Sequence, residues 1–344
     1  DDSHPLVLTI DGHTVHSRRT SILDELPARA SRLVKRRSLE LLNDRSRWGK
    51  LSDDDRDTDT EPTVVLRLGS VDGSSTRELE LALVDQPVER QPWPQTRSRW
   101  LDGSLGYLRL TVLDEGAARD VHRAMATFRR SAGLVIDLRD SAGVSHEPLI
   151  ALAGYLSDPT AGPWVACSAA FQEAAYPGDL LEQQGMEALD SRWWSHAQAA
   201  AFDKQLRAFD PYEELPGEFS ELQHLILGAT GGLGEYHYTK PVAVLSNAGS
   251  QGAAEVFLGV LESRRNVLIA GQTSGGHSAP AQSFELPHTG IRVSFTSLVI
   301  YRPDGARYDH TGVTAFVDVE DLPEYHLEGG RDRVLEAAVR SLLR

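Results

Sequence analysis

Two strand–helix–strand patterns constrain the fold of this chain more than any other feature of its sequence. The first begins with "GYLRLTV" at Gly106, continues with apolar residues at helical spacing and ends in the apolar stretch "GLVIDLRD". The second begins at "KPVAVLSN", crosses through an apolar helix and returns as "NVLIAGQT". Strands joined by a crossover helix pair in parallel, and parallel sheets are covered by helices on their faces. We therefore expect an α/β fold.

The first hundred or so residues are organised differently. The stretch "PLVLTIDGHTV" predicts a strand entering a tight Asp-Gly turn, and "TVVLRLGSVDGSSTRELELAL" predicts two strands around a Gly/Ser turn. Between them, "ARASRLVKRRSLELL" predicts a basic helix. The run "SDDDRDTDTE" predicts a solvated loop, because it lacks the central glycine of a calcium loop. The stretch "DQPVERQPWPQ" is typical of a linker.

We accordingly place a β-rich module in residues 1–97 and a second domain in residues 98–344. Residues from about 157 to 239 are aromatic and irregular, and we expect an insertion there that forms part of a substrate wall or serves ordinary packing.

Composition and charge narrow the classes of partner. A formal net charge of -15 argues against nucleic acid, whose binding depends on Lys and Arg neutralising phosphates. Cys167 is the single cysteine, so an internal disulfide or a thiolate metal cluster is excluded, and we expect no metal or cofactor. No apolar run is long enough for a membrane span, and "DDSHPLVL" lacks the features of a signal peptide. We expect a soluble protein, either cytoplasmic or secreted after processing.

Five stretches occur in the order found in one peptidase family. They are "GYLRL", "VIDLRDSAG", "KPVAVLSNAGSQGAAEVFLGVL", "IAGQTSGGHS" and "YRPDGARYDHTGV". From Gly106 to Glu320 the chain thereby resembles the S41 peptidases, the tail-specific or C-terminal processing proteases. The resemblance implies an S41 peptidase-like (ClpP/crotonase-like) βαβ core that acts on polypeptides. It also implies that the β-rich module is PDZ-like, since such a domain often precedes this core.

The resemblance further implies where a catalytic dyad would lie. In the family a serine precedes a helix, and a lysine about two dozen residues later removes its proton, because a hydroxyl needs a base to become a nucleophile. Alignment on Glu255 places the serine position at Gly252 and the lysine position at His277, and no lysine follows Lys240. The usual dyad therefore cannot form at these positions. A replacement dyad of Ser250 and His277 is one hypothesis, since imidazole has a pKa of about 6.5. Weaker candidates are Ser278, His146 and His310.

An anion site is the second implied feature. The turn at Gly252 and Ala253 should open a helix whose free N–H groups favour negative charge. In the family, the turn after "DLR" helps to form an oxyanion hole, and Ala142 and Gly143 occupy that turn here. Its other residues differ from the family's asparagine and paired glycines. The alternative is that the glycines only permit tight turns.

Three functions follow from these observations. The first is a serine peptidase of S41 type with a rearranged nucleophile. The second is a pseudoenzyme, a degenerate peptidase that binds polypeptides without cutting them. The third is a different reaction on a small-molecule substrate, in which an oxyanion hole stabilises an enolate-like intermediate and His277 moves a proton.

Overall fold

The computed structural model describes residues 3–24, 32, 36, 38, 42, 63–83, 97–158, 162–173, 181, 184–189, 194–207, 209, 215, 217–228, 236–320 and 330–344. Tertiary contacts divide the chain into two units, one of Asp1–Gln91 with Leu322–Asp332 and one of Pro92–Asp321 with Arg333–Arg344. The domain boundary that the sequence places at 97/98 stays a prediction. The predicted basic helix, acidic loop and linker lie almost entirely outside the described residues.

The first unit contains a four-stranded antiparallel sheet in the order β2-β1-β3-β4. Asp11 and Gly12 form its first turn with φ of 47° and 73°, the positive values of a tight hairpin turn, as the sequence predicts. The Asp11 side chain also accepts a hydrogen bond from the Val65 N–H at 2.8 Å, which ties this turn to β3. The likeness of this unit to a PDZ domain stays a prediction. Its elements are β1 (Leu6–Ile10), β2 (His13–Thr14), α1 (Val15–Asp24), β3 (Thr63–Gly69) and β4 (Thr76–Ala82).

The second unit is built on a six-stranded sheet in the order β18-β14-β13-β8-β6-β5. Neighbouring strands within this sheet pair in parallel, except that β5 is antiparallel to β6. Both predicted strand–helix–strand units are confirmed, the first as β6-α3-β8 and the second as β13-α7-β14. The strands are β5 (Arg97–Leu101), β6 (Leu105–Arg109), β8 (Gly133–Asp137), β13 (Val242–Ser246), β14 (Val267–Gly271) and β18 (Val317–Asp318).

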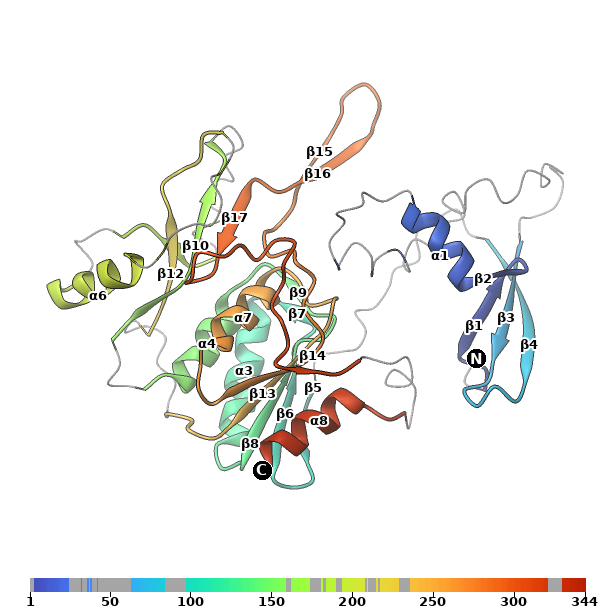
Figure 1. Ribbon diagram of the computed structural model, residues 1–344, viewed down its shortest axis with the longest axis horizontal. Helices are drawn as coiled ribbons and strands as arrows, with labels where there is room; N and C mark the ends of the chain where they lie inside the picture. Colours follow the sequence, from blue (N-terminus) through green and yellow to red (C-terminus); the bar gives the residue numbers. More distant parts are fainter. Residues whose placement is uncertain are drawn as a thin grey trace. The chain divides into compact units, whose positions relative to one another are not determined.

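Helices cover both faces of this sheet (Figure 1). On one face lie α3 (Glu115–Phe128), α4 (Glu147–Leu156) and α7 (Ala253–Glu262), whose apolar side chains form the larger core. The Asp114 side chain caps α3 by accepting from the Ala117 N–H at 2.9 Å. On the other face, α8 (Arg333–Leu342) buries Val334 and Ala338. The chain is therefore an α/β protein, as the alternation of strands and helices predicts.

A second sheet corrects one expectation. Residues 157–239 are not simply irregular, because they contribute three strands of a four-stranded antiparallel sheet in the order β11-β12-β10-β17. The strand β10 (Trp164–Phe171) is buried on both faces, so it lacks the alternation that marks a half-buried strand. The remaining elements are β7 (Val112–Leu113), β9 (Ala142–Gly143), β11 (Met186–Glu187), α6 (His196–Leu206), β12 (Gln223–Leu227), β15 (Gln282–Glu285), β16 (Arg292–Phe295) and β17 (Leu298–Tyr301).

Among the described helices, none combines the length and the apolar character that crossing a bilayer requires.

Candidate functional site

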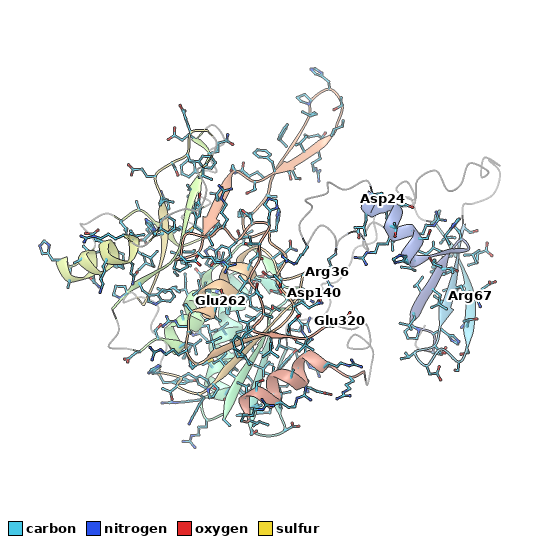
Figure 2. All side chains as sticks on the ribbon, in the orientation of Figure 1. Asp24, Arg36, Arg67, Asp140, Glu262 and Glu320 are labelled. Carbon is cyan, nitrogen blue, oxygen red and sulfur yellow. The ribbon has the colours of Figure 1, made fainter. Side chains whose placement is uncertain are left out.

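Three turns meet where the parallel strands β8, β13 and β14 end. The carboxyl ends of parallel strands lie at one edge of a sheet, where α/β proteins commonly place their sites. Backbone hydrogen bonds join the turns: the Gln251 N–H donates to the Ser141 carbonyl at 3.0 Å, and the Gly252 N–H to the His277 carbonyl at 2.7 Å. Asp140 lies in the turn after β8 (Figure 2). The fold thus brings together the main positions that the sequence analysis selects.

Gly252 is the residue immediately before α7, and it lies at the position where the resemblance places the nucleophile. Its φ of 62° and ψ of -132° lie where side chains are rarely tolerated without strain. A Cβ built at residue 252 would also overlap the carbonyl oxygen of Gly143. In this conformation the turn therefore has no room for a serine side chain.

Gly143 lies in β9, which pairs in parallel with β7. Its φ is 142°, and a Cβ there would overlap the backbone of Leu113, so only a glycine fits. Because the peptide bond is trans, a carbonyl directed at Gly252 turns the N–H of Val144 away from it. Gly143 thus presents its carbonyl oxygen to position 252, and the donor role expected for its own N–H stays a prediction.

The other two predicted oxyanion donors differ from each other. The Ala142 N–H donates to the Thr111 carbonyl at 3.1 Å, so this amide is already committed to the backbone of a neighbouring segment. The Ala253 N–H is the first donor of α7, and no acceptor for it exists among the described residues. This amide is therefore available to an acceptor at the turn that the Gly143 carbonyl also faces, and the anion site itself stays a prediction.

Ser250 is buried, and its hydroxyl closes the turn between β13 and α7. The hydroxyl donates to the Leu138 carbonyl at 2.8 Å and accepts from the Asn247 N–H at 3.1 Å. No hydrogen bond joins this hydroxyl to the His277 ring in the described part of the chain. A base at His277 would have to break the bond to Leu138 before Ser250 could attack, so the structure does not form the predicted Ser250–His277 dyad.

Glu255 plays a part that the sequence analysis misses, since there it serves only to align the motif. Its fully buried carboxylate accepts hydrogen bonds from the Ser274 hydroxyl, from the Gly276 N–H at 2.7 Å and from the His277 N–H at 2.5 Å. Burial raises the pKa of Glu255 to about 7, although the three hydrogen bonds act in the opposite direction. This carboxylate fixes His277 beside Gly252. The available signal was an acidic residue inside the apolar helix "AAEVFLGVLE".

A buried ionic network anchors the turn after β8. Asp137 accepts from the Tyr107 hydroxyl at 2.8 Å, from Arg139 Nη2 at 2.6 Å and from Arg109 Nη1 at 3.2 Å. Burial by itself raises the pKa of Asp137, but the charges of Arg139 and then Arg109 outweigh it and hold the pKa below its usual value. Arg109 also donates to the Arg139 carbonyl at 3.1 Å, so the network holds the backbone that leads into residues 140–143.

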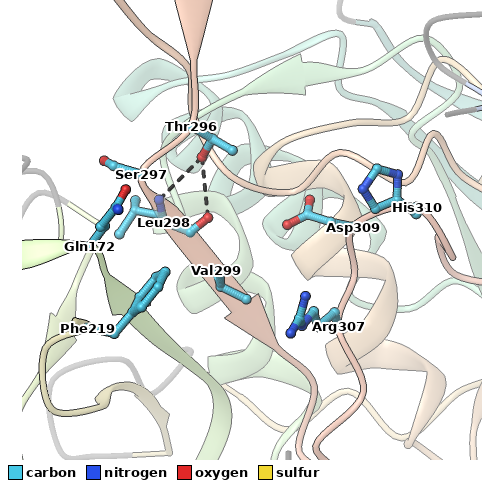
Figure 3. A pocket seen from close by; sticks show the side chains of 9 residues that line it. All are labelled: Gln172, Phe219, Thr296, Ser297, Leu298, Val299, Arg307, Asp309 and His310. Atoms are coloured by element: carbon cyan, nitrogen blue, oxygen red, sulfur yellow. Dashed lines mark hydrogen bonds between the residues drawn. The ribbon is translucent and has the colours of Figure 1, made fainter. Parts of the chain in front are cut away.

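The weaker candidates have separate environments. Buried His146 donates through Nδ1 to the Gln184 carbonyl at 3.0 Å, and burial lowers its pKa to about 4, so it is neutral at pH 7. The Ser278 N–H donates to the Asp309 carboxylate at 3.1 Å. His310 is exposed and, with Asp309, lines a cavity of about 150 Å³ (Figure 3).

Among the described residues, no group of His, Cys, Asp or Glu is arranged to hold a metal ion.

Similarity to known proteins bears on the family and on the fold. The model of peptidase family S41 matches residues 104–319. A carboxy-terminal-processing protease of Bartonella bacilliformis is 25% identical over 225 residues, which cover 65% of this chain and 41% of that protein. The chain thus spans about two fifths of the length of this relative.

Two solved structures are similar in fold. One is a putative peptidase from Parabacteroides merdae, with a TM-score of 0.51 and 19% identity over 72% of this chain and 64% of that one. The other is mature CPAF in complex with lactacystin, with a TM-score of 0.58 and 18% identity over 91% of this chain and 72% of that one. These similarities confirm the fold that the sequence predicts.

Proposed function

Because the chain belongs to peptidase family S41, we propose that it binds extended polypeptide segments beside the three turns and does not cleave them by serine and lysine chemistry. Family membership supports a protease-like function on polypeptides. The proposal that no cleavage occurs is supported by the position of the Gly143 carbonyl oxygen, which fills the space that a side chain at residue 252 would need.

The chemistry of the site supports this proposal. Acyl transfer by a serine requires a hydroxyl, a base within hydrogen-bond reach and donors for the developing oxyanion. Residue 252 supplies no hydroxyl, and the Ser250 hydroxyl is committed to Leu138. A carbonyl oxygen directed at this position would repel an oxyanion, so the conformation disfavours the intermediate as well as the attack.

The test separates binding from cleavage. Reduced, alkylated lactalbumin serves as a permanently unfolded polypeptide, its binding is followed by fluorescence anisotropy, and its integrity is followed by mass spectrometry. Salt at about 0.3 M suppresses non-specific charge attraction, because the screening length then falls below about 8 Å. We expect saturable binding, an intact polypeptide and no labelling by a fluorophosphonate probe that labels an active S41 peptidase in parallel. Cleavage, labelling or an absence of binding would contradict the proposal.

A second candidate is a non-proteolytic reaction in the same place, with His277 as acid or base. It is favoured by the Ala253 N–H, which has no acceptor in the described part of the chain, and by the backbone bond that holds His277 against Gly252. It also requires the Gly143 carbonyl to turn away from the site, which is why we rank it second. Once a small-molecule substrate is identified, unchanged turnover in His277→Ala would remove the role given to this residue.

A further inference from the structure

The hairpin of β15 and β16 has one polar face and one apolar face. Directly opposed residues of an antiparallel pair share a face, and the faces alternate along each strand. The polar face carries Ser283 opposite Ser294, whose hydroxyl oxygens lie 2.7 Å apart, and Glu285 opposite Arg292. The other face is apolar apart from Gln282, and its apolar members are Phe284, Leu286, Ile291, Val293 and Phe295. A sheet with this pattern commonly packs its apolar face against a neighbour.

The apolar face of this hairpin is open. The hairpin projects from the rest of the second unit (Figure 1), and in the described part of the chain each of its strands pairs only with the other. Phe284 is 48% exposed, Ile291 56% and Phe295 38%. The rings of Phe284 and Phe295 pack edge to face with centroids 5.9 Å apart, a contact within the hairpin itself. Because an isolated two-stranded hairpin is marginally stable in water, this one needs further strands or a packing partner.

The backbone of β16 offers a regular free edge. The Leu286 N–H donates to the Ile291 carbonyl at 2.9 Å, so this pair is joined across the hairpin. Joined pairs alternate with pairs whose N–H and C=O groups point outward, and the register between β15 and β16 contains no bulge. Arg292 and Ser294 therefore direct their backbone groups away from β15. The strand β16 also has no proline, so it lacks two of the devices that commonly protect an edge.

We propose that β16 pairs with β16 of a second copy of this chain, antiparallel about a two-fold axis at Val293. Outward-facing residues oppose one another in such a pair, so Arg292 of each copy lies opposite Ser294 of the other and exchanges backbone hydrogen bonds with it. Val293 then lies opposite its own counterpart, and the two hairpins form a continuous four-stranded sheet. Two-fold dimers that use the same surface of both copies are the commonest protein oligomers.

This register suits a second copy on both faces of the sheet. On the apolar face, Ile291 lies opposite Phe295 of the second copy, so apolar side chains meet across the axis. On the polar face, Arg292 meets a serine and not a second arginine, and its own hairpin places Glu285 on its other side. Residues 281–296 contain one acidic and one basic residue in a chain whose net charge is -15. Two copies that meet at this hairpin therefore bring no net charge together there, although the whole chains repel each other.

The outer edge of β15 is less suited to this contact. The same alternation directs the backbone groups of Ser283 and Glu285 outward, and a two-fold pair about Phe284 would place Gln282 opposite Leu286. A polar amide would then meet an apolar side chain on the apolar face. We therefore assign the contact to β16, and the edge of β15 serves as an internal control.

Sedimentation velocity of the full chain over a range of concentrations tests the dimer. One strand pair is small beside the ~800 Å² per partner of a stable complex, so we expect a reversible dimer with a dissociation constant on the order of 10 μM. Ser294→Pro removes an outward N–H and leaves the backbone bonds between β15 and β16 in place, so it should raise this constant at least about tenfold. Ser283→Pro is the matched control, because it makes the same change at the outer edge of β15 and should leave the constant at the parental value.

Disulfide trapping tests the register directly. In the proposed pair the Cα atoms of Val293 and its counterpart lie about 4.5 Å apart, within the range that a disulfide spans. Val293→Cys should therefore give a disulfide-linked dimer on oxidation with diamide. Phe284→Cys, on the same face of β15, should give no linked dimer under the same conditions. Cys167 is buried, so it adds little background.

Several results would overturn the proposal. One is a chain that sediments as a monomer at concentrations well above the expected constant, and another is a dimer that Ser294→Pro leaves intact or that Ser283→Pro weakens. A monomer whose hairpin amides exchange more slowly with phosphatidylcholine vesicles present would instead assign the apolar face to a lipid surface. None of these results bears on polypeptide binding, which the lactalbumin assay tests separately.

Discussion

The carbonyl oxygen of Gly143 occupies the space in which the Cβ of residue 252 would lie. Gly143 is itself confined, because the backbone of Leu113 fills the space of its own Cβ. The turn after β8 and the turn before α7 therefore pack backbone against backbone, each at a positive φ. This packing is the structural reason why the expected nucleophile position holds no side chain.

Gly252→Ser should destabilise the protein and should not by itself restore peptide hydrolysis. The substitution adds a side chain at a φ of 62° and against a backbone oxygen, so we expect a loss of about 2–4 kcal/mol in the free energy of unfolding. Gly252→Ala is the control, because the Cβ and not the hydroxyl causes the strain, and urea denaturation should give similar losses for both. A serine variant as stable as the parent would show that the Gly143 peptide turns readily.

The double variant Gly252→Ser/His277→Lys extends this test to catalysis. It supplies both members of the family's dyad at the aligned positions. Hydrolysis requires in addition that the Gly143 carbonyl leave position 252, so we expect little or no cleavage in a peptide assay. Robust cleavage by the double variant, or by the serine variant alone with His277 as base, would overturn this expectation.

Glu255 should make stability fall as the pH rises toward neutrality. Its pKa is raised from 4.5 to about 7 in the folded protein, so the folded state binds the proton more tightly than the unfolded state does. The resulting stabilisation is fully present below about pH 4.5 and is lost as the pH rises through about 7. It amounts to at most about 3 kcal/mol.

Glu255→Gln isolates this contribution, because it removes the titration at nearly the same shape. We expect the difference in unfolding free energy, parent minus variant, to decrease steadily between about pH 4.5 and 7 in chemical denaturation. A difference that is flat across this range, or that increases, would show that the carboxylate is better solvated or more strongly hydrogen bonded than its burial implies.

Asp137→Ala should be among the most destabilising single substitutions in the second unit. It leaves the buried charges of Arg109 and Arg139 without their common carboxylate, which costs about 3–5 kcal/mol in comparable buried pairs. Asp120→Ala breaks the exposed ion pair with Arg123 and should change stability by less than about 0.5 kcal/mol. Thermal unfolding of both variants makes the comparison. Equal effects would mean that the buried network does not anchor the turn.

His277→Ala should leave both stability and polypeptide binding nearly unchanged. In the structure this residue joins the site through its backbone, donating its N–H to Glu255 and accepting from the Gly252 N–H. The substitution keeps both of these bonds, so we expect a change within about 0.5 kcal/mol in unfolding free energy. A large loss of affinity for the unfolded polypeptide would instead assign the imidazole a direct contact with the bound segment.

The sequence by itself determined the parallel core and the family of this protein. Apolar runs separated by helical spacing are local signals, and the ordered motifs around "DLR" and Glu255 locate the turns that meet at the sheet edge. The residues at positions 252 and 277, where alignment on Glu255 places the serine and the lysine, are likewise read directly from the sequence as glycine and histidine.

The tertiary structure alone decided the chemistry around those positions. The direction of the Gly143 carbonyl follows from the pairing of β9 with β7, and the Ser250 hydroxyl turns inward because Leu138, far away in sequence, offers it an acceptor. The second sheet likewise depends on β10 pairing with β17, more than a hundred residues later. Each of these features is a contact between distant segments, and local residue patterns carry no information about which distant groups a backbone amide or hydroxyl will meet.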